Sequence, residues 1–533
     1  MEGKLLLKGN DTYSWIQIEN LSFMGYFFDE NHKLYRNQEA VDYITNELKT
    51  LSLEQICRKI NGLFSLITIS EKEYSLASDA VNFFPLFYKI SHNQLIISDR
   101  WETIIDFTQK FNFNKDAVDE FETAGFVLSN ETLDKSVYKT NANQILRFSN
   151  LEQKVSQYQN FITDSFFDQS FGDLAKDSEK VLMQVGEKLI LFLNGKTAVV
   201  PLSGGYDSRL IVSLLKKIKY KKVICFTYGK NNPEVPISKM VAEELDYDWH
   251  FVDFTKIDIE EIQAKSEFRD YLDFAANGYS MPYLMEYFAV SELKNNKLIP
   301  EDSVFLPGHS GDFLGGSYMK KTVKNHISFQ NLPASIESKY FVFTQKSHTK
   351  KNQIQKRLQH SLSPIGQSYF SGDFNMSVEE WDIQEKLAKF IFHSSQVFLY
   401  FGFEVYFPLW DKELVNFYRK VPFEFRENKK LYDHVLEKYF FQPQNISFDK
   451  KELSVSAFQF FLQKVKDAIR YFFPWKVVLK RMNDADWPYY QELTRPMKSY
   501  LETKRKKEFS HFKTYNAVIC AWYIEYIQEK YKF

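Results

Sequence analysis

TAVVPLSGGYDSRLIVSLLKK, residues 197–217, joins a buried strand pattern to an amphipathic helix pattern through the turn SGGYDS. The apolar run at 198–202 predicts a strand, and the later spacing predicts a helix that begins near Arg209. Gly204 and Gly205 lack a Cβ atom, so the backbone can turn sharply and bring N–H groups close to phosphate oxygens. The helix adds the positive end of its dipole. This order of elements predicts an anion site.

The side chains of the turn suit a polyphosphate that carries a metal ion. Ser203 and Ser208 can donate hydroxyl hydrogen bonds to phosphate oxygens, and Asp207 can bind Mg²⁺. The turn lacks the Gly-Lys-Ser/Thr ending of a Walker A loop, so no lysine is placed to grip the β and γ phosphates. We therefore expect ATP and Mg²⁺, with cleavage between the α and β phosphates. A chance turn before a helix is the alternative, because Ser, Gly and Asp are common there.

Helix and strand patterns alternate after the turn. The expected elements are a helix at 210–217, a strand at 222–227, a helix at 237–245 and a strand at 249–253. Such alternation predicts an α/β fold with a parallel sheet covered on both faces.

The regions on either side of this α/β segment have different patterns. Up to about Asp164, short β-type runs such as FMGYFF, LFSLITI and QLIIS alternate with turns, which predicts sheets. The polar stretch at 161–177 is the expected linker, with a helix beginning at Asp177. We expect one domain at 1–165 and a second at 175–533, mostly helical toward its end and without a recognisable motif from about 455.

Bulk properties exclude several classes of protein. A chain of 533 residues with 44% apolar content can bury more than one core. Its 68 basic and 69 acidic residues balance, so no overall field attracts nucleic acid or anionic lipid, and the run KRKKE at 504–508 is expected to be a solvated helix face. The longest apolar run, 397–410, is too short to span a membrane and contains Glu404, so we expect buried core.

Cysteine and histidine usage favours a protein of the reducing cytoplasm. Cys57, Cys225 and Cys520 are far apart and odd in number, which suits neither a disulfide framework nor a thiolate metal site. The N-terminal residues lack the apolar core of a signal peptide. The ten histidines are scattered, so we expect no histidine-bound metal.

SGGYDS resembles the pyrophosphate loop, SGGxDS, of the asparagine synthetase and β-lactam synthetase family of adenylating enzymes. FTYG, from Phe226, resembles the strand end whose backbone meets adenine, and LPGHSGDFLGGSY at 306–318 resembles the family's second loop. The resemblance implies that Asp207 and Asp312 bind Mg²⁺. It also implies that the nucleotide contacts Leu202, Ser203, Gly204, Gly205, Asp207, Ser208, Phe226 and Gly308.

Later and earlier segments extend the resemblance over almost the whole chain. FGFEVYFPLWDKELVNFYRKVP at 401–422 resembles a further family motif, and NKKLYDHVL follows where the family has a lysine that steadies the adenylated intermediate. Lys429 or its neighbour Lys430 would fill that role, although a solvated pair is the alternative. Residues 60–98 are similar to the glutaminase-type N-terminal domain. The implied fold is an Ntn-type αββα sandwich followed by an adenine-nucleotide α-hydrolase-like, Rossmann-like parallel-sheet domain.

Departures from the family pattern alter the expected reaction. Glutamine-using members begin with a catalytic cysteine, but position 2 is Glu2, which cannot form the thioester of glutamine hydrolysis. We therefore expect nitrogen from ammonia or another amine. His309 replaces a glutamate or tyrosine of the family and could accept the amine's proton, or could be a packed loop histidine. Glu385 is a second candidate for that proton. Tyr406 replaces an arginine, which makes aspartate doubtful as the substrate.

These features predict an AMP-forming, glutamine-independent carbon–nitrogen ligase that acts on small molecules. The segment from Glu385 to Asp411 most resembles synthetase-like proteins of surface-polysaccharide gene clusters, which are thought to amidate sugar carboxylates. Ring closure within one substrate is an alternative reaction. The sequence also allows a nucleotide-binding regulator whose chemistry has decayed, or an RNA-modifying ligase, which would require a basic surface that the charge balance does not indicate.

Overall fold

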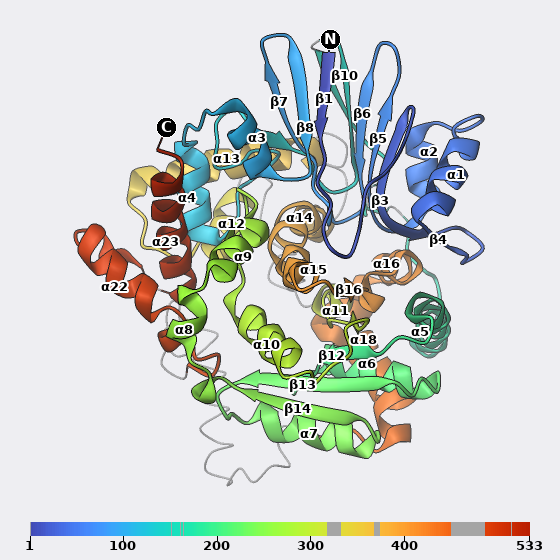
Figure 1. The fold of residues 1–533 in the computed structure, drawn as a ribbon. Coiled ribbons are helices and arrows are strands. Elements are labelled where there is room, and N and C mark those ends of the chain that lie inside the picture. Colours follow the sequence, from blue (N-terminus) through green and yellow to red (C-terminus); the bar gives the residue numbers. More distant parts are fainter. Residues whose placement is uncertain are drawn as a thin grey trace.

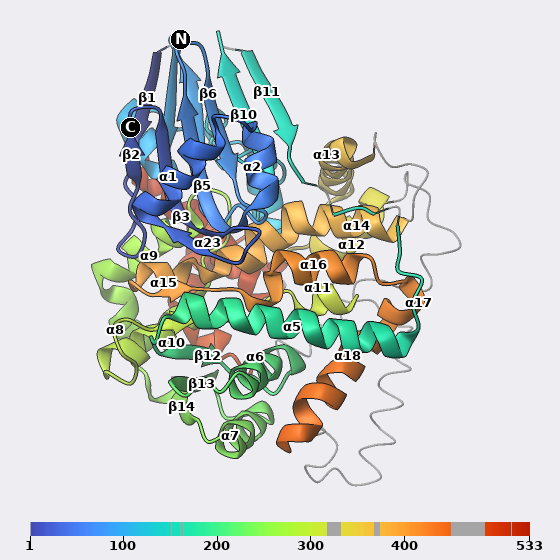
Figure 2. The same cartoon turned by 90° about the vertical axis from the view of Figure 1, so that its right-hand side faces the viewer.

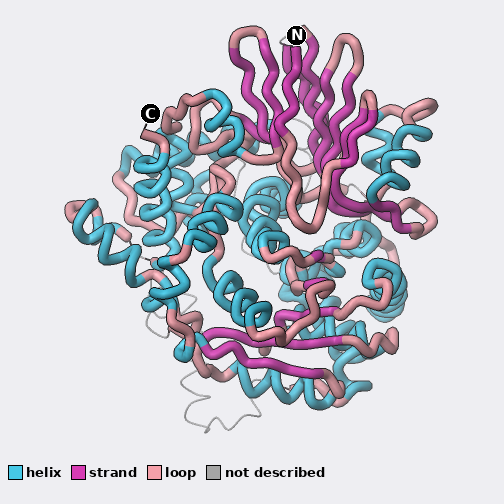
Figure 3. The backbone as a smooth tube through the Cα atoms, viewed as in Figure 1, coloured by secondary structure: helices cyan, strands magenta, loops and turns pink. Residues whose placement is uncertain are grey.

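The computed structural model describes residues 2–150, 152–159, 161–163, 165–316, 332–366, 374–448, 486–512 and 514–532. Figure 1 shows a sandwich of β-sheets above a larger, mainly helical region that holds a second type of sheet. Figure 3, coloured by secondary structure, shows strands gathered in the sandwich and again near the base, with helices between them. The C-terminal helix α23 (Tyr515–Lys530) returns to pack against α4 (Lys115–Ala124).

Two sheets form the sandwich. One has the order β1-β8-β7-β9, and the other has the order β11-β10-β6-β5-β3-β2, with β4 also paired to β3. Their bounds are β1 Glu2–Leu6, β2 Ile16–Ile18, β3 Leu21–Phe28, β4 Leu34–Arg36, β5 Asn61–Ile69, β6 Tyr74–Ser78, β7 Phe87–Ser91, β8 Gln94–Ser98, β9 Tyr138–Lys139, β10 Gln144–Ser149 and β11 Glu152–Gln157.

The sandwich has four layers. Buried residues of both sheets, among them Ile67, Tyr88 and Phe148, pack between them. Helices α1 (Asn37–Glu47) and α2 (Leu53–Lys59) cover the outer face of the larger sheet, and α3 (Trp101–Thr108) packs on the smaller one. Strand β3, LSFMGYFF, is buried at every position because both of its faces are covered. The αββα arrangement expected from the resemblance is confirmed.

A five-stranded parallel sheet forms the base of the larger region. Its order is β14-β13-β12-β15-β16, and the bounds are β12 Ala198–Pro201, β13 Val223–Gly229, β14 Asp248–Asp253, β15 Val304–Phe305 and β16 Glu404–Val405. Helix α5 (Phe171–Leu193) precedes β12, and the helices between the strands include α6 (Tyr206–Lys217), α7 (Glu234–Glu244) and α10 (Leu284–Asn295). Figure 2 shows α5 running beside α16 (Lys412–Arg419) and α18 (Lys430–Leu436). The predicted α/β alternation is confirmed.

Three helices begin earlier than predicted. Helix α6 begins at Tyr206, not near Arg209, so part of the SGGYDS turn is its first turn. Helix α5 begins at Phe171 inside the expected linker, because the side chain of Ser170 caps it by accepting a hydrogen bond from the Asp173 N–H. Helix α7 begins at Glu234 rather than 237, and its proline lies in the first turn, where the missing N–H has no cost.

The rest of the described chain is mainly helical, as predicted. Its α-helices are α8 Ile259–Ala264, α9 Ser266–Ala276, α11 Gly311–Gly315, α12 Leu332–Tyr340, α13 His348–Gly366, α14 Phe374–Asp382, α15 Gln396–Tyr400, α17 Phe423–Arg426, α21 Tyr490–Leu493 and α22 Arg495–Lys504. The run at 504–508 is not the predicted helix face, because α22 ends at Lys504 and Arg505 is ion-paired with Glu122 of α4. Much of the motif-free region, 449–485, lies outside the described residues.

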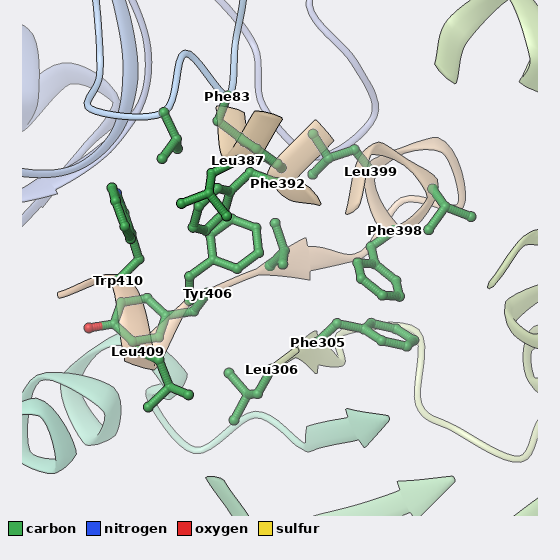
Figure 4. Packing of buried hydrophobic residues seen from close by; sticks show 14 of the residues in the cluster. Phe83, Phe305, Leu306, Leu387, Phe392, Phe398, Leu399, Tyr406, Leu409 and Trp410 are labelled. Carbon is green, nitrogen blue, oxygen red and sulfur yellow. The ribbon is translucent and has the colours of Figure 1, made fainter. Parts of the chain in front are cut away.

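An aromatic-rich core joins the sandwich to the larger region. Phe83, in the loop between β6 and β7, packs against Phe407 with ring centroids 5.4 Å apart, and the Phe392 ring lies 4.8 Å from that of Phe407. Phe392 also lies 5.0 Å from Trp410 between centroids, and Figure 4 shows Phe83, Phe392 and Trp410 in this core. The run at 397–410 is largely buried here, as predicted. Among the described residues, no helix combines the length and apolarity needed to cross a membrane.

Candidate active site

A pocket of about 350 Å³ lies at the carboxyl ends of β12, β13 and β15, the edge at which open α/β sheets bind ligands. It gathers both predicted loops, one lysine from 427–430 and two residues from the β13 side. The lining residues are Pro201, Ser203, Gly205, Tyr206, Asp207, Ser208, Tyr228, Glu286, Pro307, Gly308, His309, Asp312 and Lys429.

The SGGYDS turn is closed by its two serines. The Ser203 N–H donates to Ser208 Oγ over 3.0 Å, the two hydroxyls lie 3.0 Å apart, and the Gly205 N–H donates to Ser203 Oγ over 3.2 Å. Gly205 is the N-cap of α6. A Cβ atom on Gly204 would approach Glu234 Cβ to 3.1 Å, so the turn packs closely against α7. The result is a compact helix N-terminus that faces the pocket.

The second loop contacts the first directly. A Cβ atom on Gly308 would lie 2.9 Å from Ser208 N, and one on Gly311 would lie 2.2 Å from Asp207 Cγ. Ser310 between them has a φ of 75°, and its hydroxyl donates to the Leu409 carbonyl over 3.0 Å. Glycine is therefore required at two positions where the loops meet, because any side chain would displace Asp207 or the helix start.

Lys429 lies between the two predicted metal ligands. Its Nζ is 3.0 Å from Asp312 Oδ1 and 3.7 Å from Asp207 Oδ1, and Tyr432 donates its hydroxyl to Asp207 over 3.1 Å. Burial raises the pKa of Asp207 to about 6, with Lys429 opposing the shift. Burial works against the charge of Lys429, but Asp207 and Asp312 together raise the pKa of this lysine above its ordinary value. The cluster thus holds a protonated lysine beside two carboxyl groups.

Residues 196–452 match the family model of asparagine synthase. The chain contains an asparagine synthase domain. A protein of Methanocaldococcus jannaschii, provisionally named as a glutamine-hydrolyzing asparagine synthetase, is 24% identical over 282 residues, covering 49% of this chain and 50% of that protein. The Microcin J25-processing protein McjC of Escherichia coli is 19% identical over 282 residues, covering 52% and 51%. The chain spans about half the length of the curated relatives it matches.

Solved structures give weaker similarities. The NH3-dependent NAD synthetase of Campylobacter jejuni is 13% identical, with 39% of this chain and 91% of that chain covered and a TM-score of 0.20. The glutamine phosphoribosylpyrophosphate amidotransferase of B. subtilis is 10% identical, with 57% and 59% covered and a TM-score of 0.19.

His309 lines the pocket of the asparagine synthase domain. Its Nε2 lies 3.1 Å from Ser395 Oγ, and its ring lies 5.8 Å from Phe407 and 6.2 Å from Phe392, between centroids. Burial lowers the pKa of His309 to about 4. The imidazole is therefore neutral near pH 7, and it both packs against aromatic rings and reaches the site.

The asparagine synthase domain does not place two of the predicted catalytic residues in the pocket. The buried carboxylate of Glu385 accepts the Ser129 N–H over 3.0 Å and pairs with Lys389, which satisfies it away from the site. Lys430 directs its ammonium to the Glu424 carbonyl, 3.3 Å away. Lys429 has a left-handed backbone with a φ of 62°, so the two consecutive lysines point in different directions. We therefore assign neither Glu385 nor Lys430 a role in the reaction.

Leu202, directly after β12, and Phe226, in β13, are backbone neighbours and do not line the pocket. The Leu202 N–H donates to the Phe226 carbonyl over 2.8 Å, and Thr227 Oγ1 donates to the Leu202 carbonyl over 2.7 Å. Both apolar side chains are buried. Of the predicted nucleotide contacts, Ser203, Gly205, Asp207, Ser208 and Gly308 line the pocket, whereas Leu202, Gly204 and Phe226 do not.

Four residues of the asparagine synthase domain's site were not predicted from the sequence. Tyr228 and Glu286 line the pocket, Tyr432 bonds to Asp207, and buried Arg209 donates to the carbonyls of Gly204 and Ile446 over 3.2 and 3.0 Å. Arg209 directly follows SGGYDS, so its position was a usable signal. Tyr228 and Tyr432 lie inside FTYG and NKKLYDHVL, which the resemblance had already marked, whereas Glu286 comes from a segment without a motif and reaches the pocket only in the folded chain.

Proposed function

We propose that this chain is an ATP-dependent carbon–nitrogen ligase that adenylates a substrate carboxylate, releases pyrophosphate and transfers the acyl group to an amine or to ammonia. The supporting observation is the direct packing of the SGGYDS turn on the second loop, with Asp207, Asp312 and Lys429 in one pocket. The asparagine synthase domain at 196–452 supports the same chemistry. The family match alone does not bring the two loops and Lys429 together, and the site needs all three.

In the proposed reaction the outer phosphates of ATP lie against the start of α6. The free N–H groups of a helix N-terminus bind anions, and the hydroxyls of Ser203 and Ser208 lie at the same place. The substrate carboxylate attacks the α-phosphorus, the bond to the bridging oxygen of the β phosphate breaks, and pyrophosphate leaves. An acyl-adenylate is the product of this step. Lys429 offsets negative charge on the phosphates and on the acyl oxygen.

The residues present fit Mg²⁺. Among the described residues, no group of three or more His, Cys, Asp or Glu side chains could hold a metal by itself. Asp207 and Asp312 are nevertheless gathered around one cation, Lys429, and Mg²⁺ in nucleotide sites is typically held by one or two carboxylates together with substrate phosphates. These two residues would hold the ion, which would supply neutralisation of the leaving pyrophosphate.

The second step transfers the acyl group to nitrogen. The amine attacks the acyl carbon, AMP leaves, and one proton must be removed from the nitrogen. His309 is the pocket residue proposed to receive that proton, because burial keeps its imidazole in the neutral form. Its hydrogen bond to Ser395 orients the ring.

We propose that glutamine is not the nitrogen donor. All three cysteines of the chain are buried, and burial raises the thiol pKa of Cys57, Cys225 and Cys520, so none supplies the thiolate that glutamine hydrolysis needs. The core between the sandwich and the larger region is filled by aromatic rings such as Phe83 and Phe392 (Figure 4). Free ammonia or another amine is therefore the donor.

The proposed carboxylate is a sugar uronic acid used in a surface polysaccharide, and the proposed location is the cytoplasm. Tyr406, which stands where the resemblance has an arginine, is buried 4.8 Å from Phe192 between ring centroids. That position therefore offers no positive charge to an amino-acid substrate. The polysaccharide assignment itself depends on the resemblance of the segment from Glu385 to Asp411.

The test is carboxylate-dependent exchange of labelled pyrophosphate into ATP, over a panel that includes aspartate and uronic acid sugars. Exchange that depends on a uronate supports the proposal. Absence of exchange with every carboxylate of the panel contradicts it. Turnover that requires added ammonium would favour transfer between molecules over ring closure within one substrate.

A further inference from the structure

One carboxylate in the pocket has a role in neither step above. Glu286 lies in the first turn of α10 and lines the pocket. Its Oε2 atom is inaccessible to solvent and has no hydrogen-bond partner among the described residues. An unpaired buried carboxylate oxygen is costly in free energy, and it is relieved when a ligand supplies a donor.

The surroundings hold Glu286 in one orientation. Tyr228 donates its hydroxyl to Glu286 Oε1, and the Tyr228 ring lies parallel to Phe254 with centroids 5.8 Å apart. Tyr283 and Tyr490 are also near, but their hydroxyls bond to each other. Oε1 is therefore occupied by the Tyr228 hydroxyl, whereas Oε2 has no partner among the described residues, and the residue as a whole lines the pocket.

The sheet order separates Glu286 from the reacting groups. Strand β12, which leads into SGGYDS, is flanked by β13 on one side and β15 on the other. Tyr228 is in β13 and α10 packs on β13, whereas His309 and Asp312 follow β15. A nucleotide whose outer phosphates occupy the central turn must extend its nucleoside to one flank and leave the other to the acyl substrate. The flank with His309 and Lys429 holds the groups that the acyl transfer uses.

Resting on the function proposed above, we infer that Glu286 is the nucleoside-reading residue of this chain, and that its carboxylate accepts a hydrogen bond from the nucleoside half of ATP. Two kinds of donor exist there, the 6-amino group of adenine and the hydroxyls of ribose. A carboxylate accepts from either. If the donor is the 6-amino group, the carboxylate rejects a 6-oxopurine, because the carboxylate oxygen and the 6-oxo oxygen are both acceptors and no proton lies between them.

The experiment measures binding to the full chain by calorimetry at pH 8, with Mg²⁺ present. The ligands are ATP, inosine triphosphate (ITP), 2′-deoxy-ATP and 3′-deoxy-ATP, so that loss of the amino group and loss of each hydroxyl are separate arms. The variant is Glu286→Gln, which keeps the shape but supplies an amide that can donate to a 6-oxo group. The matched control is Glu292→Gln on the same helix, where the carboxylate accepts from Asn296 outside the pocket.

We expect the unchanged chain to prefer ATP over one of the three analogues by at least about 10-fold, the effect of one charged hydrogen bond. Glu286→Gln should reduce that ratio about 10-fold, and Glu292→Gln should leave it unchanged. If Glu286→Gln no longer discriminates against inosine triphosphate, the 6-amino group is the donor to Glu286. If it no longer discriminates against one of the deoxy analogues, the missing hydroxyl is the donor. Tyr228→Phe, which frees Oε1, should move the same ratio in the same direction and serves if Glu286→Gln does not fold.

Two outcomes would overturn the inference, and each differs from failure of the proposed function. Unchanged ratios in a folded Glu286→Gln variant that binds MgATP would show that Glu286 reads no part of the nucleoside. Equal binding of all four ligands by the unchanged chain would show that nothing reads it. Absence of any nucleotide binding by the unchanged chain would instead contradict the ligase proposal.

Discussion

The ammonium of Lys429 lies 3.0 Å from Asp312 Oδ1, although 117 residues separate them in the chain. The same ammonium is 3.7 Å from Asp207 Oδ1, so one cation bridges the acidic side chains of both loops. A pyrophosphate and its metal would compete for these contacts. Nucleotide binding at this cluster would therefore affect both loops at once.

Asp207→Ala should lower pyrophosphate release at least about 100-fold, because an electrostatic partner of the leaving group is lost. The measurement is pyrophosphate–ATP exchange with the carboxylate that supports it in the unchanged chain. Circular dichroism checks that the variant is folded. Near-normal exchange would remove Asp207 from the site.

The consecutive lysines provide a matched pair of variants. Lys429→Met should lower turnover about 100-fold, since it removes the cation between Asp207 and Asp312. Lys430→Met should stay within about twofold, because the Lys430 ammonium bonds to a backbone carbonyl outside the pocket. Steady-state kinetics measures the turnover of both variants. Equal losses of turnover would contradict the assignment of Lys429.

Gly311→Ala should weaken MgATP binding about 10-fold or more. The new methyl group would lie 2.2 Å from Asp207 Cγ, so the carboxylate must move. Gly172→Ala is the control, because a Cβ atom there meets its nearest neighbour at 3.9 Å. Calorimetric titration of both variants is the measurement. Wild-type affinity in the Gly311 variant would show that the two loops do not act together.

Glu286→Gln should change how stability depends on pH. Burial raises the pKa of Glu286 to about 7 from an ordinary value of 4.5, so the folded state holds the proton more tightly than the unfolded state. The stability that this proton provides is fully present below about pH 4.5 and is lost as the pH rises through about 7. Glutamine does not titrate. The free energy of unfolding of the variant, relative to that of the wild-type chain, should therefore rise over this pH range, by on the order of 2 kcal/mol at pH 8.

Urea unfolding at pH 5 and at pH 8 measures that difference. Parallel stability profiles for the two proteins would show that Glu286 titrates normally. Glu292→Gln, on the same helix, should follow the unchanged chain at both pH values.

Ammonium should support turnover and glutamine should not. The chain's thiols are buried with a raised pKa, so Cys57→Ser should retain the ammonium-dependent rate within about twofold. Assays with each nitrogen source, together with measurement of glutamate release, test the point. Glutamate release that Cys57→Ser abolishes would show a working glutaminase.

Local features of the fold were predictable because their causes are local. A buried strand, a glycine turn and an amphipathic helix are adjacent in residues 197–217, and the structure shows all three in that order. The start of α6 was misjudged, since SGGYDS reads as a turn while Tyr206 already has helical geometry. Its N-cap, Gly205, has no side chain to mark the boundary, unlike Ser170 at α5.

Amino-acid order alone predicted the parallel sheet and the β-rich region before it, because periodicity and turn chemistry act within a few residues. The layered αββα arrangement was implied by the family resemblance, and the polyphosphate role of the SGGYDS turn stays a prediction. Tertiary structure alone decided that Lys429 rather than Lys430 enters the pocket, that Glu385 is satisfied by Lys389 elsewhere, and that Glu286 faces the site. These outcomes depend on which strands are neighbours and on backbone direction at single residues. Neither is encoded in local spacing, since the partners lie far apart along the chain.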